Sequence, residues 1–510
     1  MESFPWLTVL IALPALAALG LALVRVPDKT AKMVALGVSI VEILIAIVAA
    51  ASFGFANAAS VQLTELYPWI PQLGVSWALG VNGLALVMIL LAVALVPLAI
   101  LAYRPTVAVD GEERGSEAGY VALILLLEAF MVAIFAARDV FLFYVVFEAM
   151  LIPVYFLVGR FGGAKRRAAA IKFLLYSLAG GLIMLVGIIA IYGYGPGGRQ
   201  GFLIDTLAGV PMPAGVEMAI FLSFFIAFAI KAPMVPVHTW LPDTAEQAPA
   251  GTSVLLVGIL DKVGTFGMIM LCLPLFPNAS AKAAPVIVIL AVISIIWGGL
   301  MAVAERDLLR LVSYTSVSHF GFIVMGIFIG SAVAMTGSMV YMVAHGITTA
   351  GMFFIVDFLG RRGGTVEIPA YRGMQRTTPV LAGLFLVTGL ASIALPGLSG
   401  FVPEYMVLMG SFGANVWAAS FAVLGVIIAA LYVLLPYQRV FTGPRQEDAL
   451  VSRADLDGNE KTVMAPLIAA MVILGVVPSL VINAVAPVAD EYTIQTDATI
   501  SAQLFDRSAK

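Results

Sequence analysis

The stretch that decides the fold is "AFAIKAPMVPVHTWLPD", residues 227–243, which starts as an apolar helix and then breaks. Lys231 stands in the apolar run, and Pro233 and Pro236 interrupt the helix directly after it. His238 follows the second proline. A lysine inside the hydrocarbon of a bilayer costs roughly 2.5–3.5 kcal/mol on insertion scales, and each proline costs about 3 kcal/mol inside a regular helix. The stretch therefore predicts a membrane helix that is broken around a charged group.

The rest of the chain has the composition of a membrane protein with many spans. Of its 510 residues, 62% are hydrophobic and only 11% are charged, with a mean hydropathy of +1.05. Soluble domains carry about 25% charged residues. The single cysteine, Cys272, excludes an intramolecular disulfide and a thiolate cluster for zinc or iron–sulfur. The first apolar run begins without basic residues and is long enough to span, so we expect a retained helix rather than a cleaved signal.

The predicted fold class is an all-α polytopic membrane protein with about 14 transmembrane helices, because a hydrocarbon core of about 30 Å needs roughly 20 helical residues. Segments seven and twelve are too long for one straight helix and contain prolines, so both are expected to be broken. The expected segments are 3–24, 31–54, 82–103, 117–137, 139–160, 167–192, 214–246, 251–274, 284–303, 307–329, 333–357, 379–410, 415–438 and 462–486.

Charge placement predicts the orientation of these segments. Most of the 27 Lys and Arg residues fall in the odd-numbered connections, as the positive-inside rule expects of cytoplasmic loops. Both termini are therefore expected on the outer, periplasmic side of a bacterial inner membrane.

The two broken segments are five apart, which predicts two inverted five-helix repeats. Pairing their helices by index sets Lys231 against Glu404 and Glu148 against His319. The expected division is an N-terminal three-helix segment, two five-helix repeats, and a last part with a loop, the final helix and the tail. These cover residues 1–116, 117–274, 275–441 and 442–510.

Four expected spans each carry an ionisable residue near the middle of the bilayer: Glu148, Lys262, His319 and His345. No solvated face exists at that depth. Such groups face a bundle interior or a hydrated cavity and mark ion or proton paths. We therefore interpret this set as functional, together with Lys231, His238 and Glu404 at the two breaks.

Other buried acids are open to a structural interpretation. Glu42, Glu128 and Asp357 can equally be hydrogen-bonded groups that tie helices together, and Asp357 can pair at a helix end with Arg361 and Arg362. No metal or haem site is expected, because the three histidines are far apart in sequence and have no cysteine partner. The Gly-rich stretch "GPGGRQG" at 195–201 lacks a following Lys-Ser/Thr and is interpreted as a turn.

Five stretches together resemble a known family. They are "KAPMVPVHTWLPDTAEQAP" (231–249), "LDKVGTFG" (260–267), "ERDLLRLVSYTSVSHFGFIVMG" (305–326), "AHGITTAGMFF" (344–354) and "LPGLSGFVPEYMVL" (395–408). The chain is similar to the antiporter-like membrane subunits of respiratory complex I, most of all to the M-type subunits of NADH-quinone oxidoreductase, the counterparts of mitochondrial chain 4. Glu404 distinguishes the M-type subunits from the others, because sister subunits and the subunits of multisubunit Na⁺/H⁺ antiporters usually have lysine at the matching position.

The resemblance implies a role for each matching residue. Glu148 matches a glutamate that pairs with the broken-helix lysine, here Lys231. Lys262 matches a central lysine, and Glu404 matches the terminal acid of the outer half-channel. The resemblance assigns His319 and His345 as relay histidines between them, and His238 follows the break. In one departure, Asp261 precedes Lys262 where an apolar or small residue is expected.

The resemblance further implies proton translocation driven by quinone reduction elsewhere in an enzyme complex. No cofactor is expected in this chain, while flavin, iron–sulfur clusters and quinone are expected in partner subunits. The expected partners are other membrane subunits, above all the sister antiporter-like subunits, and the lipid bilayer, with no nucleic acid. Two alternatives stay open: a monovalent cation/proton antiporter subunit, autonomous or in a multisubunit complex, and a structural scaffold whose charges only hold helices together.

Overall fold

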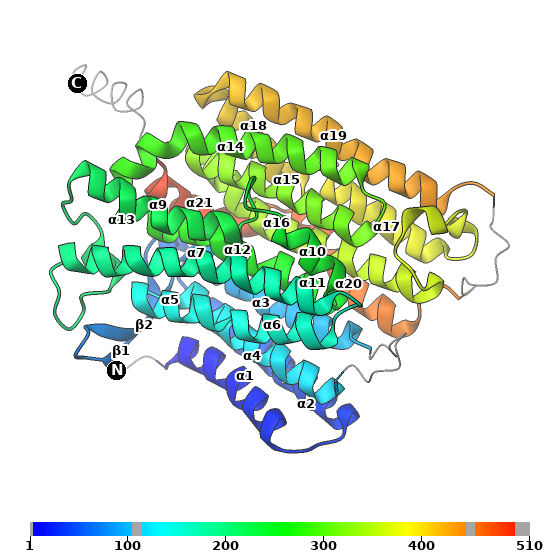
Figure 1. Ribbon diagram of the computed structural model, residues 1–510, viewed down its shortest axis with the longest axis horizontal. Helices are drawn as coiled ribbons and strands as arrows, with labels where there is room; N and C mark the ends of the chain where they lie inside the picture. Colours follow the sequence, from blue (N-terminus) through cyan, green and yellow to red (C-terminus); the bar gives the residue numbers. More distant parts are fainter. Residues whose placement is uncertain (1–3, 105–114, 445–453, 495–510) are drawn as a thin grey trace.

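The protein is a bundle of long, nearly parallel helices in a computed structural model that describes residues 4–104, 115–444 and 454–494 (Figure 1). Thirteen helices in this part of the chain are long and apolar enough to cross a membrane. Eleven of them are single α-helices: α1 (Trp6–Leu23), α2 (Asp28–Ala51), α3 (Gly83–Ala102), α4 (Glu117–Ala136), α7 (Arg166–Tyr194), α9 (Ala214–Lys231), α14 (Pro277–Ala304), α15 (Leu308–Phe328), α16 (Ala332–Gly363), α19 (Val416–Phe441) and α20 (Gly458–Val476).

Some segments of the bundle are interrupted and consist of two or more pieces, of which α9 and α20 alone reach the length of a span. Among them, α5 and α6 meet at Met150, and one central span contains two π-helical turns, η2 and η3. The pieces are α5 (Val140–Ala149), α6 (Leu151–Phe161), α9 (Ala214–Lys231), α10 (Trp240–Gln247), α11 (Ala250–Leu255), η2 (Leu256–Leu260), α12 (Lys262–Gly267), η3 (Met268–Cys272), α13 (Leu273–Leu275), α17 (Pro379–Ser392), α18 (Phe401–Ala414), α20 (Gly458–Val476) and α21 (Ser479–Tyr492). Short helices in the connections are η1 (Phe55–Asn57), α8 (Ile204–Leu207), η4 (Ile368–Ala370) and η5 (Met374–Arg376).

The first predicted break is confirmed. Helix α9 ends at Lys231 and α10 begins at Trp240, with both prolines in the segment between them. The break leaves carbonyls at the end of α9 without helical donors, and the indole Nε1 of Trp240 donates a hydrogen bond to the carbonyl of Ile230 at 2.9 Å. The chain therefore turns inside the bundle without losing all of its backbone hydrogen bonds.

The second predicted break is confirmed as well. Helix α17 ends at Ser392 and α18 begins at Phe401. Between them Ala394 and Gly397 have positive φ angles of 58° and 90°, which end the regular helix. Each of these two helices has 14 residues, too few to cross alone, so together they form the predicted broken segment twelve.

Two features differ from the expectation. A β-hairpin of β1 (Gln62–Ile70) and β2 (Val75–Val81) lies between α2 and α3, and a search for long apolar runs does not detect it. The last span, expected as one helix over 462–486, consists of α20 and α21 because the chain breaks at Val477 and Pro478. The four-part division of the chain stays a prediction.

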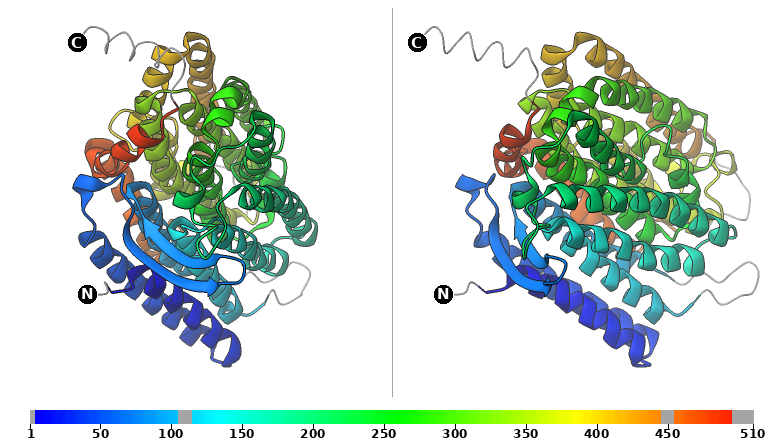
Figure 2. Two further views of the ribbon diagram at one scale, coloured as in Figure 1. Left: turned by 90° about the vertical axis from the view of Figure 1, so that its left-hand side faces the viewer. Right: turned by 60° about the vertical axis from the view of Figure 1, so that its left-hand side comes forward.

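The hairpin lies at one end of the bundle (Figures 1 and 2). Its Glu65 accepts hydrogen bonds from the backbone N–H groups of Leu7 (2.7 Å) and Thr8. The first N–H groups of a helix have no partner within the helix. The carboxylate therefore caps α1 and fixes the hairpin to it.

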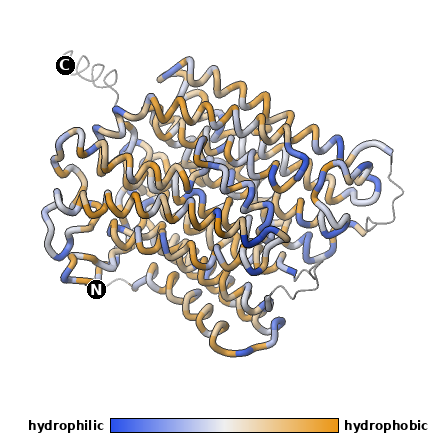
Figure 3. Tube along the Cα trace, in the orientation of Figure 1, coloured by the Kyte–Doolittle hydropathy of each residue, from blue (hydrophilic) through white to orange (hydrophobic). Residues whose placement is uncertain are grey.

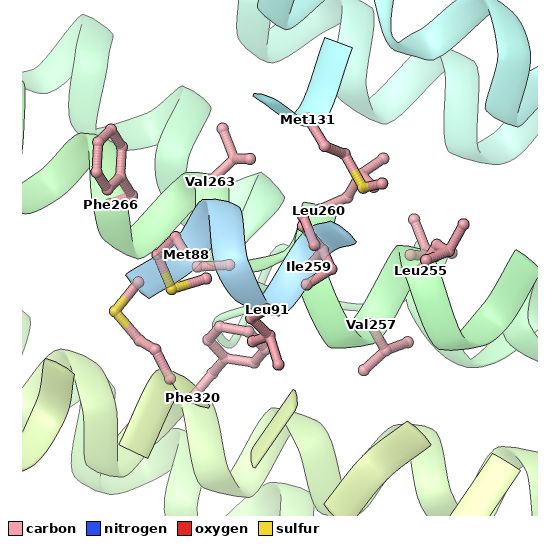
Figure 4. Packing of buried hydrophobic residues seen from close by; sticks show 14 of the residues in the cluster. Met88, Leu91, Met131, Leu255, Val257, Ile259, Leu260, Val263, Phe266 and Phe320 are labelled. Carbon is pink, nitrogen blue, oxygen red and sulfur yellow. The ribbon is translucent and has the colours of Figure 1, made fainter. Parts of the chain in front are cut away.

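The core consists of the central span from Ala250 to Leu275 together with α15 and α16, which are buried along their apolar windows. Leu91 of α3 lies near Ile259 and Phe320 in this core (Figure 4). Hydrophobic residues predominate along the outer helices (Figure 3). Among them, the side chains of Ile47, Val186 and Ile427 are exposed. Such an exposed apolar belt fits a multi-pass membrane protein. The chain ends, 1–3 and 495–510, lie outside the described residues, so the side of the termini stays a prediction.

Candidate functional site

Lys262 lies at the centre of the molecule, on the short helix between two π-helical turns. It is fully buried, and its Nζ donates a hydrogen bond to the carbonyl of Val257 at 2.6 Å. The same nitrogen is 2.7 Å from Nδ1 of His345 on α16 and 5.3 Å from the centre of the Phe320 ring. Lysine and histidine are therefore directly joined within the bundle.

A glycine on α16 allows this approach. A Cβ atom on Gly346 would lie 2.9 Å from the carbonyl oxygen of Gly258 and 2.8 Å from Leu91, tighter than ordinary contact. The absence of a side chain at Gly346 lets α16 approach η2 directly beside the Lys262–His345 contact.

Further contacts connect His345 to residues of α15 and, through Tyr341, to α18. The rings of His345 and His319 are 5.2 Å apart, and Nε2 of His319 is 2.9 Å from the Tyr432 hydroxyl of α19. Tyr341 lies one helical turn before His345, with its ring 5.7 Å from His319. Its hydroxyl donates a 2.7 Å hydrogen bond to Oε2 of Glu404. We name the set Lys262, His345, His319, Tyr341, Tyr432 and Glu404 the exit line.

Lys231 is fully buried at the end of α9. Its Nζ has no hydrogen-bond partner among the described residues. Instead it lies 5.3 Å from the ring centres of Phe147 on α5 and Phe173 on α7, which attract a cation through their ring faces. The Lys231 ammonium group thus lies between two aromatic rings.

Glu148 lies at the end of α5, against α7. A Cβ atom on Gly181 would come within 1.5 Å of Oε1 of Glu148, so the carboxyl group occupies the space that a side chain at Gly181 would fill. That oxygen is buried and unpaired within the described part of the chain. Glu148 and Lys231 interact electrostatically without a direct ion pair being formed in the described residues.

His238 lies in the segment between α9 and α10. It is buried, and its ring centre is 6.2 Å from that of Tyr314 on α15. Its Nδ1 has no hydrogen-bond partner among the residues described. The structure therefore does not join His238 to the exit line.

Ion pairs at the nearby end of the bundle fix α10. Asp243 pairs with Lys172 of α7 at 2.6 Å and with Arg310 of α15 at 2.7 Å, and Arg310 also reaches Glu246 at 3.0 Å. The helix that follows the first break is thus anchored to both halves of the bundle.

The three acids that the sequence leaves open to a structural interpretation divide into two groups. Asp357 pairs with Arg361 at 2.5 Å near the end of α16, as expected for a structural ion pair. Glu42 of α2 and Glu128 of α4 are fully buried, interact with each other electrostatically, and have four oxygens without hydrogen-bond partners within the described residues. This pair lies on helices of the N-terminal part, outside the exit line.

Within the described ranges, no group of three or more His, Cys, Asp or Glu residues is arranged to hold a metal ion. Sequence reasoning missed Tyr341 and Tyr432. The four-residue spacing from Tyr341 to His345 was a usable signal, because residues four apart share a helix face. Tyr432 had no such signal, since only the packing of α19 against α15 places it beside His319.

The comparisons with known proteins agree with this architecture. Residues 137–429 match the family model described as "NADH:quinone oxidoreductase/Mrp antiporter, TM". The chain is 42% identical to NADH-quinone oxidoreductase subunit M of Mycobacterium tuberculosis, covering 97% of this chain and 95% of that relative. It is 37% identical to the subunit M of Rhodobacter capsulatus, covering 94% and 95%.

Solved structures show the same fold. One chain of respiratory complex I from Thermus thermophilus superposes with a TM-score of 0.85 at 31% identity, covering 96% of this chain and 99% of that chain. A chain of the Mrp complex from Dietzia superposes with a TM-score of 0.83 at 22% identity, covering 98% of both. The second likeness concerns the fold alone.

Proposed function

The chain belongs to the M-type antiporter-like membrane subunits of NADH-quinone oxidoreductase, and from this premise we propose that it moves protons through a relay of buried side chains. The observation that carries the proposal is the exit line, in which Lys262 contacts His345 at 2.7 Å and Tyr341 contacts Glu404 at 2.7 Å. Ionisable groups that meet inside a membrane bundle mark proton paths. Neutral histidines can both accept and donate a proton.

The entry half of the relay consists of Glu148 and Lys231. Two unit charges about 4 Å apart attract by about 4 kcal/mol at an effective dielectric near 20. Among the described residues the two groups form no direct ion pair, so an attraction of this order holds the Lys231 proton only when the Glu148 carboxylate moves close. When the carboxylate moves away again or is protonated, the attraction is lost and the Lys231 proton is released. Transfer of one charge against 100 mV requires about 2.3 kcal/mol, which is smaller. A modest rearrangement of Glu148 is therefore sufficient to drive one step.

The exit half passes the proton from Lys262 through His345 and His319 toward Glu404 and the outer face.

The partners of this subunit are other membrane subunits of the complex. Energy for the relay comes from quinone reduction in those partners, which carry flavin and iron–sulfur clusters. We place the chain in a bacterial inner membrane with both termini outside.

The test is proton pumping by the reconstituted complex with Lys231→Ala or Glu148→Ala. The relay predicts fewer protons moved per NADH oxidised in both variants. Lys165→Ala, at an exposed position between α6 and α7, is the matched control and keeps the normal ratio. If Lys231→Ala and Glu148→Ala leave the ratio of protons to NADH unchanged, the result favours the scaffold alternative.

The antiporter alternative has one observation in its favour, which is that the matching family model also covers Mrp antiporter subunits. The buried lysines oppose it, since they repel Na⁺ and K⁺. Replacing Na⁺ by choline in the same assay separates the two functions. Pumping that persists in choline agrees with the relay, and pumping that stops agrees with cation exchange.

A further inference from the structure

Asp261 is a buried acid that the relay described above does not use. It is completely buried between η2 and α12, and neither carboxylate oxygen has a hydrogen-bond partner among the described residues. An isolated ionised carboxylate in such surroundings is strongly unfavourable. Asp261 therefore needs either a proton of its own or cations close by.

The packing of α12 directs Asp261 toward the break between α9 and α10. Gly264 lies one turn further along α12, so it shares a helix face with Asp261. A Cβ atom on Gly264 would be 2.5 Å from the carbonyl oxygen of Phe228 and 2.6 Å from the amide nitrogen of Ala232. This face of α12 thus presses against the end of α9, where Lys231 lies.

Lys262 extends in another direction from the same helix. Its Nζ reaches Val257 and His345, on the side of α16. Consecutive residues of an α-helix point about 100° apart, as 3.6 residues complete a turn. Asp261 and Lys262 therefore belong to two sides of one helix, one toward each half of the bundle.

Among the described residues, two lysines are the charged groups that act on Asp261. It interacts electrostatically with both Lys262 and Lys231, and Lys231 in turn interacts with Asp261 and Glu148. In the exit line, by contrast, consecutive groups are joined by hydrogen bonds or ring contacts. Within the described part of the chain, the entry half has no such connection from Lys231 onward. Asp261 lies on a helix that packs against the end of α9 and interacts electrostatically with both lysines.

The π-helical turn provides the local geometry. The amide of Asp261 donates to the carbonyl of Leu256, five residues back, at 3.0 Å. A π turn rotates the residues that follow it relative to a regular helix, and such turns occur frequently at functional sites. The turn sets the directions of Asp261 and Lys262 together.

We propose that Asp261 is a proton carrier between Lys231 and Lys262, connecting the entry half to the exit line. The Lys231 ammonium gives a proton to the Asp261 carboxylate, so an N–H bond breaks, an O–H bond forms, and both groups become neutral. The Asp261 acid then gives this proton to the neutral amine of Lys262, which restores the carboxylate and forms the second ammonium. The three groups remain neutral overall in each state. This inference rests on the proposed function.

The experiment compares three variants in the reconstituted complex: Asp261→Asn, Asp261→Glu and Lys231→Ala. Asparagine keeps the shape of the side chain but cannot carry the proton, so Asp261→Asn is expected to lose pumping to the same extent as Lys231→Ala. Asp261→Glu keeps a carboxyl group and is expected to restore pumping. If Lys231→Ala lowers the ratio of protons to NADH and Asp261→Asn does not, the Asp261 inference is wrong while the relay stands.

If Lys231→Ala also leaves the ratio unchanged, the relay itself fails and the inference fails with it. Infrared difference spectra during turnover distinguish a carrier from a fixed counter-ion, because only a carrier gains and loses the carboxylic acid C=O band. We expect this band in the unaltered complex and a shifted band in Asp261→Glu. Bands from Glu148 and Glu404 are expected at the same position in both proteins, so the assignment depends on one further band that shifts. Identical sets of bands in both proteins would contradict the assignment even if Asp261→Asn fails to assemble.

Discussion

At the scale of single residues, the buried carboxylate of Glu404 accepts a hydrogen bond from the Tyr341 hydroxyl. A hydrogen bond to a charged group contributes about 1.5–3 kcal/mol. Tyr341→Phe keeps the ring and removes the donor, so we expect proton pumping per NADH to fall while the complex still assembles. Tyr437→Phe, at a ring that packs against Phe385 and Phe441, is the control. If both variants move the same number of protons per NADH, Tyr341 is not part of the proton path.

The sequence predicted the titratable residues better than their partners. Lys262, His319 and His345 could be recognised because a charged or polar residue deep in an apolar run is unusual on energetic grounds. Tyr432 could not, since tyrosine is ordinary in an apolar helix and only tertiary packing makes it a neighbour of His319. The position of Glu148 against Gly181 likewise depends on how α5 and α7 pack.

At the scale of helices, the contact between η2 and α16 requires glycine at Gly346. Alanine there would place a methyl group 2.9 Å from the Gly258 carbonyl oxygen, and overpacking of a core typically costs about 1–3 kcal/mol. We expect Gly346→Ala to lower thermal stability and to separate Lys262 from His345, which lowers pumping. Thermal unfolding and pumping of the purified complex measure the two effects.

The control for that variant is Gly383→Ala in α17, where a Cβ atom meets nothing within 4 Å. Alanine is the better helix former by roughly 1 kcal/mol, so this variant is expected to be neutral or slightly more stable. If Gly346→Ala and Gly383→Ala have the same thermal stability and the same pumping, close packing at Gly346 is not what keeps Lys262 in contact with His345.

Helix breaks were predictable where proline and a charge coincide, as in both broken segments. The π turns around Lys262 were not, because "LLVGILDKVGTFG" (255–267) has no residue that an ordinary helix excludes. They lie where Gly264 packs closely against α9 and Gly258 meets α16, contacts that depend on tertiary packing. The hairpin β1–β2 was missed for a simpler reason, namely that its alternating apolar residues are too short a run to resemble a span.

At the scale of the whole molecule, the charge distribution predicts which end faces the cytoplasm. The hairpin lies at one end and the connection from α16 to α17 at the other (Figure 1). Cysteines introduced at two exposed positions test this, Ser60→Cys and Gln375→Cys. A membrane-impermeant maleimide added to intact cells is expected to label the first and not the second. The native Cys272 is buried and inert. Labelling of Gln375→Cys alone would reverse the orientation.

The central claim is that ionisable side chains from separate helices form one proton path through the bundle, with Lys262 at its centre. The most direct test is the number of protons moved per NADH oxidised by the reconstituted complex carrying Lys262→Met. Thr265→Val is the matched control, since Thr265 is buried one turn away and donates only to the Lys262 carbonyl among the described groups. We predict a lower ratio for Lys262→Met and a normal ratio for Thr265→Val. A normal ratio in Lys262→Met would contradict the account.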